Sequence, residues 1–179
     1  NASEFARSFG VTNKTVNHYL DVLTSSFVIH SLQPWHENLK KRQVKAPKVH
    51  FSDTGLLHSL LRLTTLADLE SHPKVGASWE GFVIHQVIRQ LGVNENECFF
   101  WATHAGAELD LLVVRGRRRW GFEVKRTSAP TITPSMRTAL SDLKLQRLFV
   151  VHAGEHSFDM AKKIRAVALS HVLDELKPW

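Results

Sequence analysis

A shortage of cysteine and of long apolar stretches sets the first limits on this protein. Its 179 residues include one cysteine, Cys98, which excludes an intrachain disulfide and a zinc site built from several cysteines. No run of about 18 apolar residues occurs, so the sequence predicts no membrane-spanning helix. No secretory signal is visible, and a reducing, cytoplasmic location fits these absences.

Two motifs that identify common sites are also absent. There is no G-x-x-x-x-G-K-[ST] phosphate loop, so these residues are not expected to bind ATP in that way. The 11 histidines are scattered, and none belongs to the H-E-x-x-H motif of a helical metal site. Because the first residue is Asn and not Met, we expect the chain to be part of a longer protein.

Positive charge exceeds negative charge by a modest margin. The 23 Lys and Arg residues outnumber the 17 Asp and Glu residues, which gives a formal net charge of +6 and an isoelectric point near 9.7. This balance favours an anionic partner, with nucleic acid first among the candidates. The alternative is that the excess has no specific partner, because a modest positive charge is common in globular proteins.

The first 23 residues predict two helical segments with a break between them. Ser3 and Thr12 can act as N-caps, and Gly10 suits the left-handed turn that ends the first helix. The second segment places Val16 and Tyr19 on an apolar face. This order is typical of a helix-turn-helix, whose outer face would present four polar side chains to DNA: Asn13, Lys14, Asn17 and His18. Alternatively, the second helix only packs.

A basic segment lies between two β-rich stretches, residues 27–32 and 49–51. Two strands joined by a basic loop after a helix-turn-helix are typical of a winged helix, whose wing rests on phosphates. That wing would carry the basic group Lys40, Lys41, Arg42, Lys45 and Lys48. The alternative is a solvated loop, which is where lysines commonly lie.

The clearest helix is predicted over residues 77–91, ending at Gly92. It has one apolar stripe, formed by Trp79, Phe82, Val83, Val87 and Leu91. Glu80 lies beside this stripe, and a glutamate at the margin of a buried helix needs a partner. Alternatively, Glu80 reaches solvent near the helix start, where the helix dipole favours a negative charge.

A β-hairpin is predicted over residues 108–126, read ELDLLVVRGRRRWGFEVKR. Its turn lies around Gly116 and is rich in arginine. Three of these arginines are candidates for contacts with nucleic-acid phosphates: Arg117, Arg118 and Arg119.

Three charged residues in the hairpin predict a site. Asp110 lies near the start of the first strand, while Glu123 and Lys125 lie two apart in the second and therefore point to the same face. Two carboxylates and a lysine that converge can hold a hard divalent cation and a scissile phosphate. The pattern resembles the PD-(D/E)xK nuclease signature. The alternative is that Glu123 and Lys125 are solvated neighbours on an exposed strand.

The remaining apolar runs suit an α/β (α+β) core. Strands are expected at 99–101, 148–151 and 166–169, and helices at 134–144 and 171–176. The continuous apolar run at 148–151 indicates a strand that is buried on both faces.

Several stretches together resemble one known family: FARSFGVTNKTVNHYLDVL, KVHFSDTGLLHSLL, GASWEGFVIHQVI, ELDLLVV and GFEVKR. They are similar to the C-terminal region of prokaryotic AAA-type ATPases that carry a widespread C-terminal domain of unknown function. The resemblance implies an ATPase domain, which is absent here, then a winged helix and a PD-(D/E)xK-like domain. We therefore expect a partial winged helix over 1–63, a linker over 64–76 and a restriction-endonuclease-like core over 77–179.

The resemblance also implies a site. Glu80 matches the helix acid, Asp110 the motif aspartate, and Glu123 and Lys125 the E-x-K motif, whereas Leu109 stands where the signature often has proline. Asp110, Glu123 and the backbone carbonyl of Val124 would bind Mg²⁺ or Mn²⁺, with Glu80 completing the shell or orienting a water. Lys125 would stabilise the charge that builds on the phosphate.

Three hypotheses for function follow. The first is a metal-dependent DNA endonuclease, in which the cation lowers the pKa of an attacking water. The second is a non-catalytic DNA- or protein-binding regulatory module of the ATPase. The third is a part for protein interaction alone. ATP would act only through the absent ATPase domain, nucleic acid and that domain are the expected partners, and formation of a homo-oligomer stays open.

Overall fold

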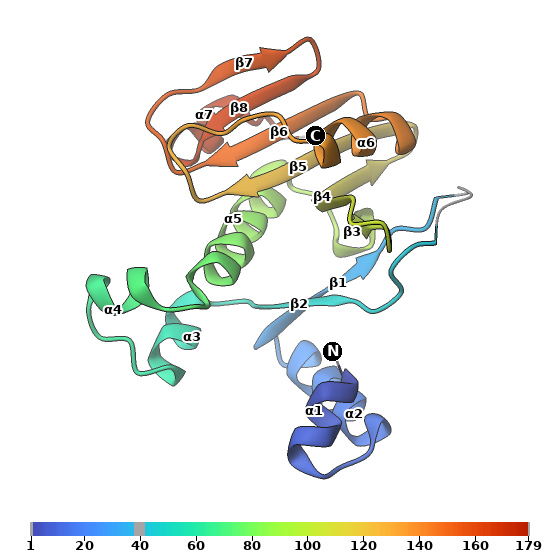
Figure 1. Ribbon diagram of the computed structural model, residues 1–179, viewed down its shortest axis with the longest axis vertical. Coiled ribbons are helices and arrows are strands. Elements are labelled where there is room, and N and C mark those ends of the chain that lie inside the picture. The colour runs from blue at the N-terminus through green and yellow to red at the C-terminus, as the bar shows by residue number, and fades with distance from the viewer. Residues whose placement is uncertain (1, 38–41, 179) are drawn as a thin grey trace.

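The computed structural model describes residues 2–37 and 42–178 (Figure 1). Eight strands form one mixed sheet in the order β2-β1-β3-β4-β5-β6-β8-β7. The strands are β1 (Ile29–Pro34), β2 (Lys48–Phe51), β3 (Cys98–Ala102), β4 (Glu108–Arg115), β5 (Arg118–Lys125), β6 (Arg147–His152), β7 (Phe158–Ala161) and β8 (Ile164–Ala168). The α-helices are α1 (Ala2–Phe9), α2 (Asn13–Ser25), α3 (Thr54–Leu60), α4 (Leu66–Ser71), α5 (Val75–Leu91), α6 (Pro134–Asp142) and α7 (Val172–Glu175). The predicted mixture of helices and strands is confirmed.

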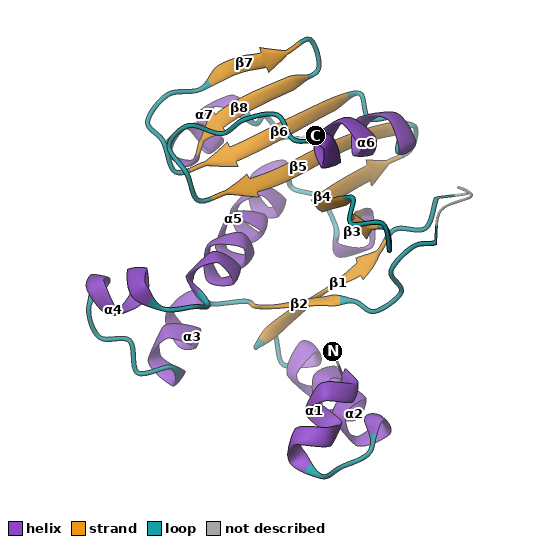
Figure 2. Cartoon of the chain, viewed as in Figure 1, coloured by secondary structure: helices purple, strands orange, loops and turns teal. Residues whose placement is uncertain are grey.

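Helices α1 and α2 form a pair at the N-terminal end, as the sequence predicted (Figure 2). Gly10 between them has φ +64°, and the Thr12 side chain accepts a hydrogen bond from the Thr15 N–H at 3.2 Å, which caps α2. The apolar spacing predicted more burial than α2 has. Val16 is its buried residue, whereas Tyr19 is 61% exposed. Spacing places residues on one face, but tertiary contacts decide whether that face is covered.

The two strands predicted as a wing enter the sheet of the C-terminal region. β1 pairs with β2 in antiparallel fashion and also pairs with β3 in parallel fashion, at Gln33–Phe99 and Pro34–Phe100. The Trp35 N–H continues this ladder with a 2.7 Å hydrogen bond to the Phe100 carbonyl. Helix α4 occupies the predicted linker. The division into 1–63, 64–76 and 77–179 itself stays a prediction.

The sheet is covered by helices on both faces (Figure 1). Helices α5 and α7 pack on one face and α6 packs on the other, with a separate apolar cluster under each. α5 ends at Gly92, as predicted, with φ +61°. Of the helices in the described ranges, none has the length and apolar character needed to cross a bilayer.

The predicted hairpin 108–126 is confirmed as β4 and β5. Its ladder runs from Arg115–Arg118 at the turn to Leu111–Phe122. The turn itself is short, since Arg115 and Arg118 already pair as strand residues. Parallel strands β6 and β8 continue the sheet from β5, and their apolar runs are buried, as expected for a sheet covered on both faces.

Candidate functional site

Asp110 lies where β4 leaves its ladder with β5. The pairing of these strands stops at Leu111–Phe122, and the register between β3 and β4 shifts between Phe99 and Trp101. The Asp110 carboxylate then accepts the Val124 N–H at 2.9 Å. A side chain therefore replaces a ladder partner at this point, and the carboxylate that does so is buried, since Asp110 is 8% exposed.

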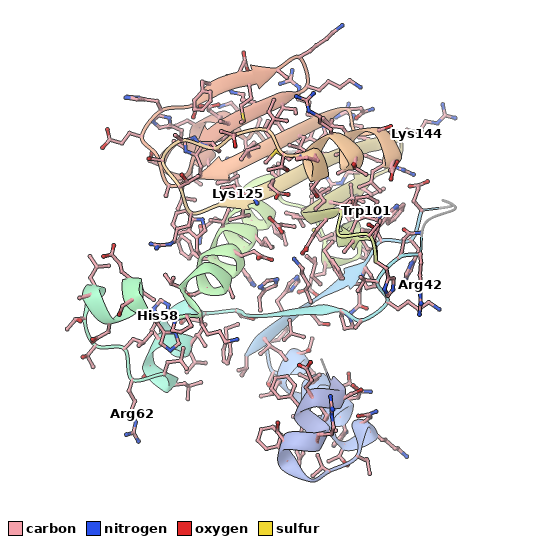
Figure 3. The ribbon with its side chains drawn as sticks, in the orientation of Figure 1. Arg42, His58, Arg62, Trp101, Lys125 and Lys144 are labelled. Carbon is pink, nitrogen blue, oxygen red and sulfur yellow. The ribbon has the colours of Figure 1, made fainter. Side chains whose placement is uncertain are left out.

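Glu123 and Lys125 lie on the neighbouring strand β5, as predicted. Glu123 is 5% exposed, and its Oε1 atom pairs with the Lys125 ammonium at 2.7 Å. Its other carboxylate oxygen, Oε2, is buried without a hydrogen-bond partner. A buried carboxylate oxygen that lacks a donor is costly for stability, which makes this atom a candidate for a functional role. Figure 3 shows Lys125 at the end of β5, near α5.

Burial and mutual repulsion shift both carboxyl groups toward neutral pH. Burial, and then the nearby Glu80 carboxylate, raises the pKa of Asp110 to about 6. Burial, and then Asp110, raises the pKa of Glu123 to about 7. Lys125 opposes the shift of Glu123, and Glu123 in turn holds the pKa of Lys125 above its usual range despite burial. A carboxyl group with a pKa near 7 suits proton transfer at neutral pH.

Lys48 lies among the carboxylates, although the sequence predicts it on the basic wing. Its ammonium group is 3.0 Å from Glu80 and 3.5 Å from Asp110, and it also pairs with Glu108. Burial alone would lower the pKa of Lys48, yet these three carboxylates together raise it above its usual range. The ammonium also lies over the Phe100 ring, 5.6 Å from its centroid.

The alternation within β2 explains why Lys48 was missed. In the run KVHF, Lys48 and His50 share one face, and that face turns inward while Val49 is 42% exposed. Apolar residues normally mark the inward face of a strand, and here the pattern is reversed. Glu108 was missed for a different reason: it is the first residue of β4, where a charged side chain is usually solvated.

The predicted set of metal ligands is brought together only in part. Glu80, Asp110 and Glu123 approach one another, but Lys48 holds the first two and Lys125 holds the third. Across residues 2–37 and 42–178, no group of three His, Cys, Asp or Glu side chains is arranged to hold a metal ion. Val124 enters the site through its N–H, and the predicted role of its carbonyl stays a prediction. As the side chains stand, this site does not fit Mg²⁺ or Mn²⁺.

The predicted nucleic-acid contacts fall in separate places. Four lie exposed on α2: Asn13, Lys14, Asn17 and His18. Lys40 and Lys41 lie outside the described residues, and Arg42 lies on the connection between β1 and β2 (Figure 3). Arg117 and Arg118 are exposed at the hairpin turn. The turn is at the opposite end of β5 from Lys125, about 23 Å away at the rise of a strand.

Arg119 differs from its neighbours because it is already engaged. Its guanidinium pairs with Glu37 at 2.5 Å, donates to the Leu143 carbonyl at 3.0 Å and lies 5.3 Å from the centre of the Trp35 ring. These contacts tie the segment after β1 to β5 and α6. These contacts give the Arg119 guanidinium a structural role, whether or not it also contacts a phosphate.

We therefore expect Arg119→Ala to lower the free energy of unfolding by about 1–3 kcal/mol, because it leaves Glu37 without its cation. The matched change Arg117→Ala, at an exposed turn residue, should stay within about 0.5 kcal/mol. Urea denaturation of both variants checks this. Equal stability of the two would contradict the structural assignment of Arg119.

Three histidines with little exposure lie close to the site, and His50 Nε2 is 3.9 Å from the Glu80 carboxylate. His30, His50 and His85 each have a buried Nε2 atom without a hydrogen-bond partner. Burial, and then Lys48, lowers the pKa of His50 to about 4, and burial also lowers the pKa of His85. Both rings are therefore neutral at physiological pH.

Comparison with known proteins places this chain in a family. Residues 1–67 match a family described as "Domain of unknown function (DUF8612)", and residues 75–172, more than half of the chain, match "Domain of unknown function (DUF4143)". The chain belongs to the DUF4143 family. Uncharacterized proteins of Mycobacterium bovis and Mycobacterium tuberculosis are each 47% identical to this DUF4143 chain over 171 residues. No solved structure matches it significantly.

The matched ranges divide the site between two segments. The DUF4143 segment contains all four residues of the predicted site: Glu80, Asp110, Glu123 and Lys125. Lys48 lies in the DUF8612 segment. The expected domain of unknown function is confirmed by this match. The match to each mycobacterial relative covers 96% of this chain but only 38% of the relative's length.

Proposed function

We propose that this chain is the nuclease-like C-terminal part of a prokaryotic AAA-type ATPase, that it acts on nucleic acid in the cytoplasm, and that its site hydrolyses phosphodiester bonds. The observation that carries the proposal is the buried, unpartnered Oε2 atom of Glu123, next to Asp110 and Lys125 on adjacent strands. Ionisable groups with strongly shifted pKa values are concentrated at functional sites. Membership in the DUF4143 family supports the resemblance to the ATPase-linked domain.

The side chains of the site suit a proton transfer beside a phosphate. With a pKa of about 7, the Glu123 carboxylate is present at neutral pH and its free Oε2 can accept a proton from a water that attacks phosphorus. The Lys125 ammonium, on the other oxygen of Glu123, is placed to stabilise negative charge on the phosphate. Asp110 holds the end of β5 in place through the Val124 N–H.

The exposed basic residues support a nucleic-acid substrate. Lys14 on α2, Arg42 on the β1–β2 connection and Arg117 at the hairpin turn are all exposed, and the net charge of the chain is +6. Contacts of this kind with phosphates are independent of base sequence and weaken as salt is added. A DNA substrate is favoured by the helix pair at the N-terminal end.

The test is cleavage of supercoiled, linear and branched DNA with Mg²⁺ or Mn²⁺ in the buffer. We expect cutting by the parent protein and a loss of at least about 100-fold in Asp110→Ala and Lys125→Ala. Lys162→Ala, which removes an exposed lysine far along the chain, is the matched control and should cut like the parent. Cutting that survives in both site variants would reject the assigned residues.

A second function is favoured by one specific observation. Lys48 and Lys125 already neutralise much of the carboxylate cluster, which suits a non-catalytic module that binds DNA or protein for the ATPase. DNA that is bound but not cut under any of these conditions would support this alternative. Absence of binding even at low salt, where phosphate contacts are strongest, would leave protein interaction as the function.

A further inference from the structure

Lys48 is held in the carboxylate site by three ion pairs. Its ammonium group contacts carboxylates from two elements, Glu80 on α5 and both Glu108 and Asp110 on β4. Its side chain is 24% exposed. Carboxylate oxygens are also the ligands that divalent cations prefer, so the ammonium occupies oxygens that such an ion would need.

The fold provides for the close approach of Lys48. β2 passes alongside α5 at Gly81, where a Cβ atom would lie 3.2 Å from His50. The missing side chain lets β2 come near enough to α5 for Lys48, two residues before His50, to reach Glu80 at 3.0 Å. The backbone of β2 therefore places Lys48 within reach of Glu80.

β2 can be withdrawn without breaking up the rest of the sheet. It has four residues and lies at one edge of the eight-stranded sheet, so β1 is the one strand to which it is hydrogen-bonded (Figure 1). Short edge strands open at lower free-energy cost than central strands do. The carboxylates, in contrast, stand on α5 and on the central strands β4 and β5, which are covered on both faces.

We propose that Lys48 is a built-in counter-ion of the carboxylate site, which keeps divalent cations out until the edge strand β2 withdraws it. This inference rests on the proposed function, since the site is the same one. It gives the N-terminal segment a regulatory role: whatever moves β2, whether nucleic acid on the basic β1–β2 connection or a neighbouring domain, opens the site to a metal ion.

The direct test is Mn²⁺ binding, followed by the electron paramagnetic resonance signal of free Mn²⁺ as the protein is titrated. Lys48→Met removes the charge and keeps much of the length of the side chain. We expect it to bind Mn²⁺ on the order of 10- to 100-fold more tightly than the parent, because one close cation no longer competes. Lys45→Met, at an exposed lysine of the same connection, is the control and should bind like the parent.

An unchanged or weaker affinity in a folded Lys48→Met protein, with folding checked by circular dichroism, would overturn the proposal. A second measurement on the parent covers the case in which this variant does not fold. Acetylation of Lys48, measured by peptide mass spectrometry, should be slow without metal and faster at saturating Mn²⁺, while acetylation of Lys45 stays the same. Slow acetylation of Lys48 under both conditions would also overturn it.

These results separate the inference from the proposed function. Tighter Mn²⁺ binding by Lys48→Met with no DNA cleavage would support the counter-ion and reject the hydrolase. Metal-dependent cleavage by the parent, with no change in Mn²⁺ affinity in Lys48→Met, would support the hydrolase and reject the counter-ion.

Discussion

Glu123→Gln is expected to raise the free energy of unfolding by about 1–3 kcal/mol at pH 8 and to change it little at pH 4. The carboxyl group of Glu123 has its pKa raised from 4.5 to about 7 in the folded protein, first by burial and then by Asp110. The folded state therefore binds this proton more tightly than the unfolded state does. Glutamine has nearly the same shape but carries no charge, so burying it avoids the desolvation penalty of a buried carboxylate.

The sign of the pH dependence follows from that difference. Between about pH 4.5 and 7 the folded chain holds the proton of Glu123 and the unfolded chain has released it, so stability falls as the pH rises through this window. Above the window, the full penalty is present in the parent and absent in the glutamine variant. Asp110, with its pKa raised to about 6, adds a parallel loss of stability with rising pH. The lost ion pair with Lys125 reduces the gain, which is why we expect the lower part of the range.

Urea denaturation at pH 4, 6 and 8 measures this effect. Glu155→Gln, at an exposed glutamate, is the matched control and should be neutral at all three values. A Glu123→Gln protein that is less stable than the parent at pH 8 would show that the carboxylate is a structural group and not a strained functional one. A gain in stability together with loss of cleavage would identify a residue that is retained for chemistry.

Trp101→Ala is expected to lower the free energy of unfolding by about 3–5 kcal/mol. Trp101 lies on β3 (Figure 3), is 0% exposed, and packs in the apolar cluster beneath α6. Its indole N–H donates to the Gln43 side chain at 3.2 Å. Truncation therefore removes a large buried surface and also releases the connection that carries β1 into β2.

The hydrogen bond from Trp101 to Gln43 can be tested separately from the packing of the ring. Gln43 also holds Glu37 through two hydrogen bonds, at 2.7 and 3.0 Å, so Trp101 anchors both ends of the β1–β2 connection to the central sheet. Trp101→Phe keeps most of the packing but removes the donor, and we expect it to cost about 1 kcal/mol. Chemical denaturation compares the three proteins. A loss below 1 kcal/mol in the alanine variant would mean that this part of the core is not well packed.

The sequence determined the local parts of the fold because their signals are local. Gly10 and Thr12 set the break between α1 and α2, Gly92 caps the end of α5, and the two apolar runs on either side of Gly116 give the hairpin, all as observed. The placing of Asp110 and Glu123 on neighbouring strands follows from the same short-range order. The sequence left open whether these charges are buried or solvated, and the structure buries both carboxylates.

Whether a basic residue is solvated or paired could not be predicted from the sequence. Lysines and arginines look alike in a sequence whether they are solvated or paired, because the partner comes from elsewhere in the chain. Arg117 stays exposed, Arg119 is held by Glu37, 82 residues away, and Lys48 is held by Asp110, 62 residues away. None of these pairings has a spacing that could have been recognised beforehand.

The sequence by itself determined the N-terminal helix pair, α5 and the hairpin, and it singled out the four residues of the proposed site: Glu80, Asp110, Glu123 and Lys125. The tertiary structure alone decided that β1 and β2 join the same sheet, and that β2 brings the Lys48 ammonium to the acids. The physical reason is the range of the interactions. Turns, caps and strand alternation depend on neighbouring residues, whereas the partner of a buried charge is set by which edge strand packs beside which helix.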